Sequence, residues 1–180
     1  MTPPSRWATT AGVTPGAGSR EAIRSVVDAL RRVVRDLRLS ARDAERAAGI
    51  SGAQLFVLQA LADASASSLN DLADRTLTDQ SSVSVVVKRL VDRKLVSRKA
   101  SNVDARRVEL ALTAAGRRLL ARCPEPTQMR LVAALRRLSS PEVQGLQRGL
   151  GALVREMGLA SEAPRMFFDD DSGRARRRQR

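Results

Sequence analysis

The sequence predicts a mainly α-helical fold with one small β-hairpin, because the spacing of its apolar residues is helical except in one short region. Apolar residues recur every three or four positions over most of residues 19–157. Between residues 95 and 112, two short extended runs flank a segment rich in turn formers, which is typical of a hairpin. Three short helices are expected in the roughly 40 residues before that hairpin. This order predicts a winged helix-turn-helix, in which the hairpin is the wing.

The composition suits one domain with tails and indicates attraction to polyanions. The chain has 180 residues, a hydrophobic fraction of 43% and a formal net charge of +13. Nearly all the positive charge comes from arginine, since lysine stands only at positions 88, 94 and 99. A GC-rich coding sequence would contribute to such an excess. The charge nevertheless predicts binding to nucleic acid first, and to an acidic membrane surface second.

Several residue types and segments are missing from the sequence, and their absence argues against other classes of protein. No apolar stretch of about 18 residues could span a membrane. The first twenty residues lack the apolar core of a secretory signal, so we expect a cytoplasmic protein. There is no His or Tyr, and Cys123 is the single cysteine. We therefore expect neither an enzyme nor a protein with a metal or other cofactor.

The first helix is predicted over residues 19–48, after a stretch at 1–18 rich in Pro, Gly, Thr and Ala that we expect to be a flexible arm. Ser19 is its expected N-cap, and Gly49 is expected to end it. The apolar stripe along this helix is narrow, so the helix is not stable alone. It must pack either on a helix of the same chain or on a second subunit.

Capping signals locate the next three helices. Ser51 and Gln54 have the spacing of a capping box, and Ser68 with Asp71 gives a second start signal. A third stripe of apolar residues predicts a helix over residues 79–93. Loops are expected between these helices, at residues 64–67 and 76–78.

The wing is predicted from strands over residues 95–99 and 108–112 with a turn over 100–105. Thr113 then caps a helix, which the prolines of Cys123-Pro-Glu-Pro126 interrupt.

The C-terminal part is predicted to hold a helix over residues 129–138 and another that restarts at Ser140, with Pro141 at its first position. Residues 161–180 are charged and end in an arginine cluster that could act as a nonspecific DNA arm or be a solvated tail. We expect this tail to be disordered, with the Phe167–Phe168 pair as its candidate for docking.

Six short motifs follow one another across residues 51–120. They are Leu69-Asn-Asp-Leu-Ala73, Ser81-Ser-Val-Ser84, Lys88-Arg-Leu90, Leu95-Val-Ser-Arg98, Asp104-Ala-Arg106 and Leu112-Thr-Ala-Ala-Gly116. Together they resemble the MarR family of bacterial transcription regulators, whose wing signature is Asp-x-Arg followed by Leu-Thr-x-x-Gly. The resemblance implies a domain over residues 19–160, with dimerisation helices at 19–48 and 129–157.

Two positions depart from the family pattern. Lys94 stands where the family usually has glycine before the first wing strand, and no proline lies near Asn102 in the wing. A lysine held at positive φ at that turn would cost about 1 kcal/mol.

The resemblance makes the helix over 79–93 the recognition helix and the hairpin a DNA-contacting wing. On the helix the candidate DNA contacts are Gln80, Ser81, Ser82, Ser84, Lys88 and Arg89. On the wing they are Arg98, Lys99, Arg106 and Arg107. By family analogy Arg106 enters the minor groove, and Asp104 supports a wing arginine by a charge-assisted hydrogen bond. The alternatives are a solvated helix face with capping serines and a solvated basic loop.

The resemblance implies a homodimeric, sequence-specific DNA-binding regulator, most often a repressor, on a pseudo-palindromic operator of double-stranded DNA. It also implies a cleft for a small-molecule effector, although no ligand motif identifies one. A nonspecific architectural DNA-binding protein and a winged helix that docks proteins remain alternatives. Cys123 is interpreted as a small buried hydrophobe in preference to a redox sensor.

Overall fold

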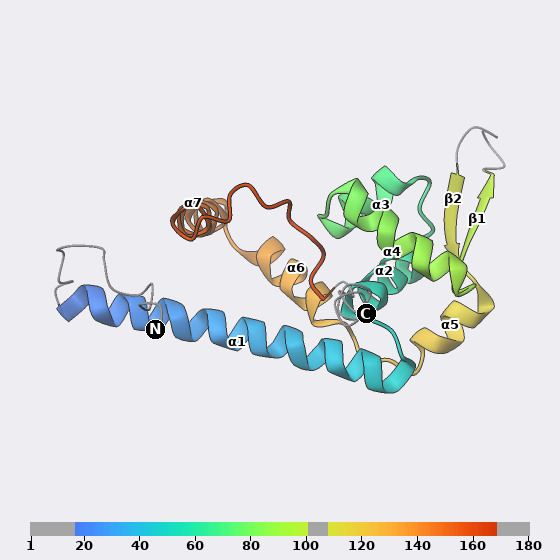
Figure 1. Cartoon of the computed structure of the whole chain (residues 1–180), viewed down its shortest axis with the longest axis horizontal. Helices are drawn as coiled ribbons and strands as arrows, with labels where there is room; N and C mark the ends of the chain where they lie inside the picture. Colours follow the sequence, from blue (N-terminus) through green and yellow to red (C-terminus); the bar gives the residue numbers. More distant parts are fainter. Residues whose placement is uncertain (1–16, 101–107, 169–180) are drawn as a thin grey trace, which may run out of the picture. The chain divides into compact units, whose positions relative to one another are not determined.

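The computed structural model describes residues 17–100 and 108–168, although the side chains of Ala17, Lys99, Ala100 and Val108 are not placed. Over these residues the chain forms seven α-helices and one two-stranded antiparallel sheet (Figure 1). The elements are α1 (Ala17–Ala48), α2 (Gly52–Asp63), α3 (Leu69–Thr76), α4 (Gln80–Asp92), β1 (Val96–Ala100), β2 (Val108–Leu112), α5 (Ala114–Leu120), α6 (Thr127–Arg137) and α7 (Ser140–Glu156). The predicted fold class, mainly α with a hairpin after a helix-turn-helix, is confirmed. The expected arm at 1–18 falls almost wholly outside the described residues.

The chain divides after Arg35 into two compact units. The first contains the N-terminal half of α1, and its apolar side chains are exposed, with Val26 at 55%. In the second unit, the remainder of α1 contributes Leu37 and Ala44 to the interior. Among the described residues of the first unit, the apolar stripe of α1 therefore has no packing partner.

The core of the second unit is built around α2, whose residues are buried on almost every side. Helices α3 and α4, the strand β2 and helix α5 all contact α2. Helix α4 presents Val83, Val86, Val87 and Leu90 to this core at helical spacing. Burial of one face of α4 leaves its opposite face for solvent.

Short-range capping bonds begin the helices of this core where the sequence predicts them. Ser51 and Gln54 form a reciprocal capping box at α2, and the Ser68 hydroxyl accepts the Asp71 N–H at α3. Helix α7 begins one residue earlier than expected, with Ser139 as N-cap. The Glu142 carboxylate accepts hydrogen bonds from the N–H and the hydroxyl of Ser139, at 2.8 and 2.7 Å.

Strands β1 and β2 pair with Val96 opposite Leu112 and Ala100 opposite Val108. Ala66 extends this pairing on the other side of β2, because it exchanges two backbone hydrogen bonds with Leu110, at 2.8 and 2.9 Å. The sequence predicts only a loop at 64–67, since a one-residue bridge has no apolar alternation to reveal it.

The base of the wing is closed by Thr113 and Gly116. The Thr113 hydroxyl donates to the Lys94 carbonyl at 2.8 Å and accepts the Gly116 N–H at 3.0 Å. A Cβ on Gly116 would overlap the Leu95 carbonyl oxygen. The Leu-Thr-x-x-Gly motif therefore has a structural role, since it fastens α5 to the turn between α4 and β1.

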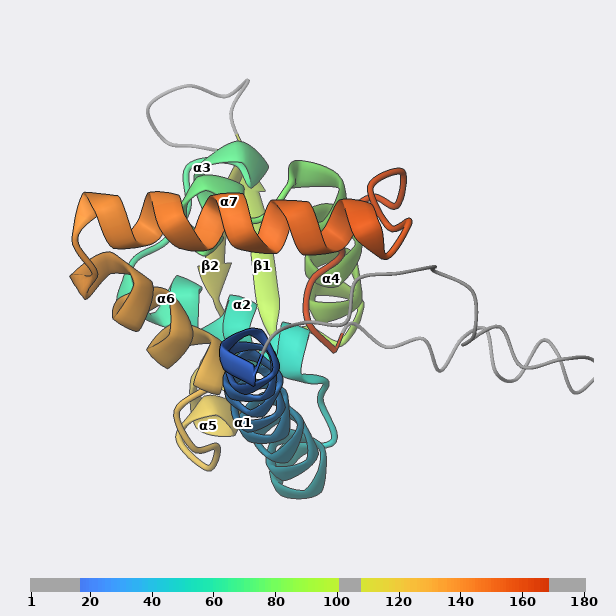
Figure 2. The ribbon, with the colours of Figure 1, turned by 90° about the vertical axis from the view of Figure 1, so that its left-hand side faces the viewer.

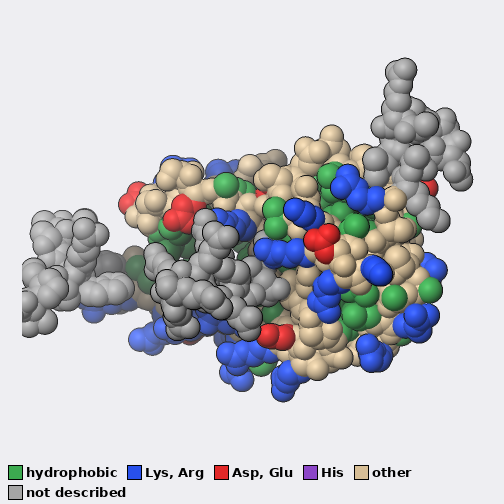
Figure 3. Space-filling view, turned by 45° about the vertical axis from the view of Figure 1, so that its right-hand side comes forward, with side chains coloured by type: hydrophobic (Ala, Val, Ile, Leu, Met, Phe, Trp, Pro, Cys, Tyr) green, Lys and Arg blue, Asp and Glu red, His purple; other side chains and the backbone are tan. Residues whose placement is uncertain are grey.

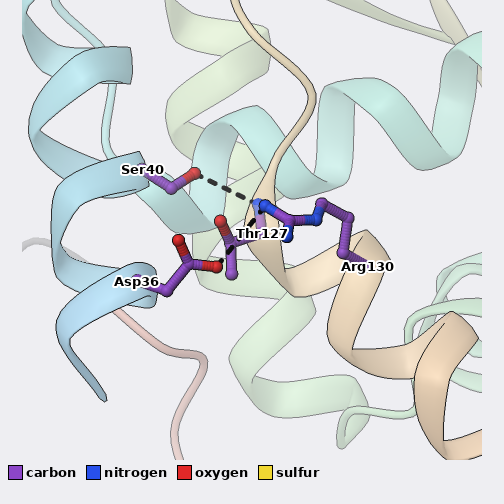
Figure 4. Close-up of polar contacts among 4 residues, drawn as sticks. All are labelled: Asp36, Ser40, Thr127 and Arg130. Carbon is purple, nitrogen blue, oxygen red and sulfur yellow. Dashed lines mark hydrogen bonds and ion pairs between the residues drawn. The ribbon is translucent and has the colours of Figure 1, made fainter. Parts of the chain in front are cut away.

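Helix α6 begins at Thr127, earlier than the expected 129. Its N-cap is Pro126, which offers no capping side chain. The Ser40 hydroxyl of α1 accepts the free Thr127 N–H at 3.1 Å instead, and Arg130 pairs with Asp36 at 3.5 Å (Figure 4). These contacts attach the start of α6 to the C-terminal part of α1.

The chain after α7 turns back toward the core rather than continuing away from it (Figures 1 and 2). Met166 is only 6% exposed and belongs to the hydrophobic core, whereas Phe167 is 54% exposed. Residues 161–168 thus differ from the expected disordered tail, and the apolar side chain that docks most deeply is Met166 rather than one of the Phe pair. The rest of that tail, 169–180, lies outside the described residues.

Candidate DNA-binding surface

The polar face of α4 carries the side chains that the sequence assigns to base and phosphate contacts. Gln80, Ser81, Ser84 and Lys88 are exposed, and Ser82 and Arg89 are half-buried. Val83, Val86 and Val87 anchor the opposite face in the core. The helix is therefore held rigidly by its apolar side while a row of donors and acceptors faces outward, as major-groove recognition requires.

Asp79 fixes the N-terminus of α4. Its carboxylate accepts hydrogen bonds from the Ser81 hydroxyl and from the Ser82 N–H, the latter at 2.9 Å. These bonds, the Ser81 hydroxyl first, lower the pKa of Asp79 from 3.8 to about 2. Ser81 thus serves the helix cap in this structure, as the alternative interpretation of the serines expects.

The turn between α3 and α4 is unusual because Leu77 occupies it in a left-handed conformation, with φ of 52°. Its side chain is 64% exposed. The Leu77 N–H and the Thr78 N–H donate to the Asp74 and Ala73 carbonyls, which terminates α3. A residue that adopts this φ without strain is normally glycine.

The wing strands are described only in part. Arg98 is exposed on β1, and Lys94 before it has φ of 58°, so the lysine does adopt the left-handed conformation. The other predicted wing residues lie outside the residues whose side chains the structure describes, and their roles stay predictions. They are Lys99, Asp104, Arg106 and Arg107.

Basic side chains are spread over the face shown in Figure 3, and acidic ones are few there. In the described part of the chain, exposed cations come from α4, from the turn before the wing, from β1, and from α5 and the turn after it. They include Lys88, Lys94, Arg98, Arg118 and Arg122. Such a surface attracts a polyanion over a distance of about 10 Å at moderate salt.

Three arginines have structural roles that the sequence analysis missed. Arg75 donates to the carbonyls of Ala60, Ala64 and Ser65 and so caps the C-terminus of α2. Arg93 donates to the Gly49 carbonyl, and Arg117 to the Leu112 carbonyl, at 2.8 and 3.0 Å. Only the tertiary structure reveals these bonds, since the acceptors are backbone atoms.

A cleft of about 320 Å³ lies beside the N-terminus of α4. Leu131, Val132 and Leu135 of α6 form one wall, and the turn between α3 and α4 forms another. The chain segment at 164–167 also lines this cleft. Its lining is mainly apolar.

The described residues give little support to a reactive cysteine or to a metal site. Burial raises the pKa of the Cys123 thiol, which disfavours the reactive thiolate. No group of three or more Asp, Glu or Cys side chains within 17–100 and 108–168 could hold a metal ion. In the same described residues, no helix has the length and apolar character needed to cross a membrane.

Comparison with known proteins identifies the winged helix. Residues 48–107 match the sequence profile of the MarR family. The transcriptional regulator BldR from Sulfolobus solfataricus is 20% identical with a TM-score of 0.50, and the match covers 76% of this chain and 96% of that one. A solved MarR family transcription regulator, SP03579, is 20% identical with a TM-score of 0.52, over 81% and 97% of the two chains.

A probable transcriptional regulator from Pseudomonas aeruginosa is 29% identical, with a TM-score of 0.48 and coverage of 71% and 96%. No curated protein matches the sequence. The profile match confirms the resemblance seen in the motifs, and the first two solved structures show the same fold.

Proposed function

From a chain whose residues 48–107 match the MarR family profile, we infer a sequence-specific DNA-binding transcription regulator that acts in the cytoplasm as a homodimer. The observation that carries the proposal is the orientation of α4. Its apolar residues are locked in the core, its exposed Gln80, Ser84 and Lys88 point outward, and Arg98 is exposed on the wing strand β1. This is the arrangement that reads base edges in the major groove.

Each part of the surface has a distinct task in this proposal. Gln80 can pair with adenine through its amide, and Lys88 neutralises a phosphate. Arg106 of the wing reaches into the minor groove, where narrow A·T tracts concentrate negative potential. The arginine excess supplies the salt-dependent part of the affinity.

Two apolar stripes that are exposed among the described residues support the dimer. Helix α7 exposes a row of large apolar side chains, and the N-terminal half of α1 exposes another. On α7 they are Val143, Leu146, Leu150, Leu153, Val154 and Met157. A second subunit would cover such surfaces and set two recognition helices about one DNA turn apart.

Repression relieved by a small-molecule effector is part of the same proposal. The effector would enter the cleft between α6 and the turn before α4 and shift α4, which changes the spacing of the two recognition helices. A reporter gene under the operator, measured with and without the regulator, distinguishes repression from activation.

The decisive experiment is selection of bound duplexes from a random library at about 150 mM salt, where binding through phosphates alone is suppressed. We expect an enriched inverted repeat with half-sites about 10 base pairs apart. The variant Arg106→Ala should weaken binding to it by about 1–3 kcal/mol. Arg24→Ala, which removes the same charge from α1, is the matched control and should retain specificity.

Absence of an enriched motif, together with binding that only declines as salt rises, would contradict the proposal. That outcome would favour the architectural DNA-binding protein, for which the net charge of +13 is the supporting observation.

A further inference from the structure

The chain itself forms one wall of the cleft beside α4. After α7 the chain returns toward the core (Figure 2), and residues 164–167 line the cleft together with α6 and the turn before α4. We call the five residues Pro164–Phe168 the strap. They come from the end of the described chain, yet the first four line the same space as Leu131 and Leu77.

Met166 holds the strap in place. Its side chain is 6% exposed and packs in the hydrophobic core, although every residue from 152 to 165 is exposed. A thioether side chain is flexible and fills irregular apolar gaps well. The strap is therefore seated by one buried side chain that comes from an otherwise solvated segment.

Two polar contacts align the strap with both walls. The buried side-chain amide of Gln128 on α6 donates to the Phe167 carbonyl at 2.9 Å. The Ser82 hydroxyl on α4 donates to the Pro164 carbonyl at 3.4 Å. Since a buried amide without an acceptor is unfavourable, Gln128 requires either the strap or another acceptor at this place.

The docked strap contains one residue with a strained backbone. Phe168 has φ of 55°, a left-handed conformation that an aromatic residue rarely adopts. Release of the strap removes that strain, which offsets part of the favourable burial of Met166. A segment with one buried anchor and a strained end is expected to open locally without global unfolding.

We propose that the strap is a tethered wall of the cleft, and that a small molecule which takes the place of Met166 can bind only after Met166 has left the core. The competing ligand would have an apolar body in place of Met166 and an acceptor oxygen in place of the Phe167 carbonyl. Its apparent affinity is then reduced by the fraction of molecules in which the strap is closed. This proposal does not require the chain to bind DNA.

Trypsin reports the state of the strap, because the bond after Arg165 lies within it and cleavage follows the open population. The full-length chain, Met166→Asp and the volume-conserving control Met166→Leu are compared under native conditions. We expect Met166→Asp to be cut after Arg165 at least tenfold faster than the wild type, and Met166→Leu within twofold. Equal rates for all three would overturn the docking of the strap.

The competition between the strap and a small molecule is tested with 1-anilinonaphthalene-8-sulfonate, which combines an apolar body with acceptor oxygens. It should bind Met166→Asp at least tenfold more tightly than the wild type, and Gln128→Ala should remove most of that gain. In the wild type the dye should accelerate cleavage after Arg165 and leave cleavage after Arg148 in α7 unchanged. Dye that binds all variants equally, or that protects Arg165, would overturn the proposal. Thermal unfolding of each variant verifies that it is folded.

Discussion

At the scale of single residues, Asp79 decides how α4 begins. Its carboxylate accepts bonds from Ser81 and Ser82 at the positive end of the helix dipole, and its pKa is about 2 in the folded chain. A carboxyl whose pKa is lower in the folded than in the unfolded state stabilises the fold above the unfolded pKa. That stabilisation is lost as pH falls from about 4 toward 2.

We predict that the difference in the free energy of unfolding between the wild type and Asp79→Asn depends on pH. Asparagine caps a helix as well as aspartate but does not titrate in this range. Between pH 4 and 2 the wild type should lose more free energy of unfolding than the variant, measured by urea denaturation. Glu142, whose pKa is lowered by the Ser139 hydroxyl and N–H, acts equally in both proteins. If the free energy of unfolding of the two proteins fell in parallel with pH, the hydrogen bonds to the Asp79 carboxylate would not stabilise the folded state.

At Lys94, the backbone conformation that the fold requires conflicts with the local preference of the residue. The chain makes the left-handed turn before β1 although no glycine is present, and the Lys94 N–H donates to the Val91 carbonyl at 2.8 Å. The surrounding hydrogen bonds, including that of Thr113, therefore override the local preference of lysine.

At the scale of elements, the packing of α5 on the wing base depends on Gly116. Any side chain there would meet the Leu95 carbonyl, which is fixed by its bonds to Thr113. We predict that Gly116→Ala lowers the free energy of unfolding by about 3 kcal/mol, because backbone atoms must move.

Gly145→Ala in α7 is the matched control for that substitution. No atom lies within 4 Å of the Cβ that it would add, and alanine is the better helix former. It should therefore raise the free energy of unfolding by about 0.5–1 kcal/mol. Urea denaturation of the two variants measures both changes in the free energy of unfolding. An unchanged free energy of unfolding for Gly116→Ala would contradict the close approach of Gly116 to the Leu95 carbonyl.

At the scale of the whole molecule, the exposed apolar row of α7 is the feature that a monomer does not explain. We predict that Leu150→Asp, at a side chain 47% exposed, converts the proposed dimer into a monomer and weakens operator binding. Gln144→Asp adds the same charge on the polar side of α7 and should leave the dimer intact. Sedimentation velocity measures both, and a wild type that sediments as a monomer would refute the dimer itself.

The sequence alone determined the order and type of the elements, because each is encoded locally. Apolar period and capping residues such as Ser51, Ser68 and Thr113 place α2, α3 and α5 within a residue or two. The motifs also located the proposed recognition helix, whose exposed Gln80, Ser81, Ser84 and Lys88 need only helical spacing to share a face.

Only the tertiary structure decided the contacts between residues far apart in the chain. Ser40 caps α6 from 87 residues away, Ala66 pairs with Leu110, and Met166 packs in the core beside a cleft that no local pattern predicts. Such contacts depend on backbone acceptors and on the space left between helices, which have no sequence signature. The sequence therefore determined which surface faces DNA in the proposed function, whereas the tertiary structure decided which segment lines the cleft beside it.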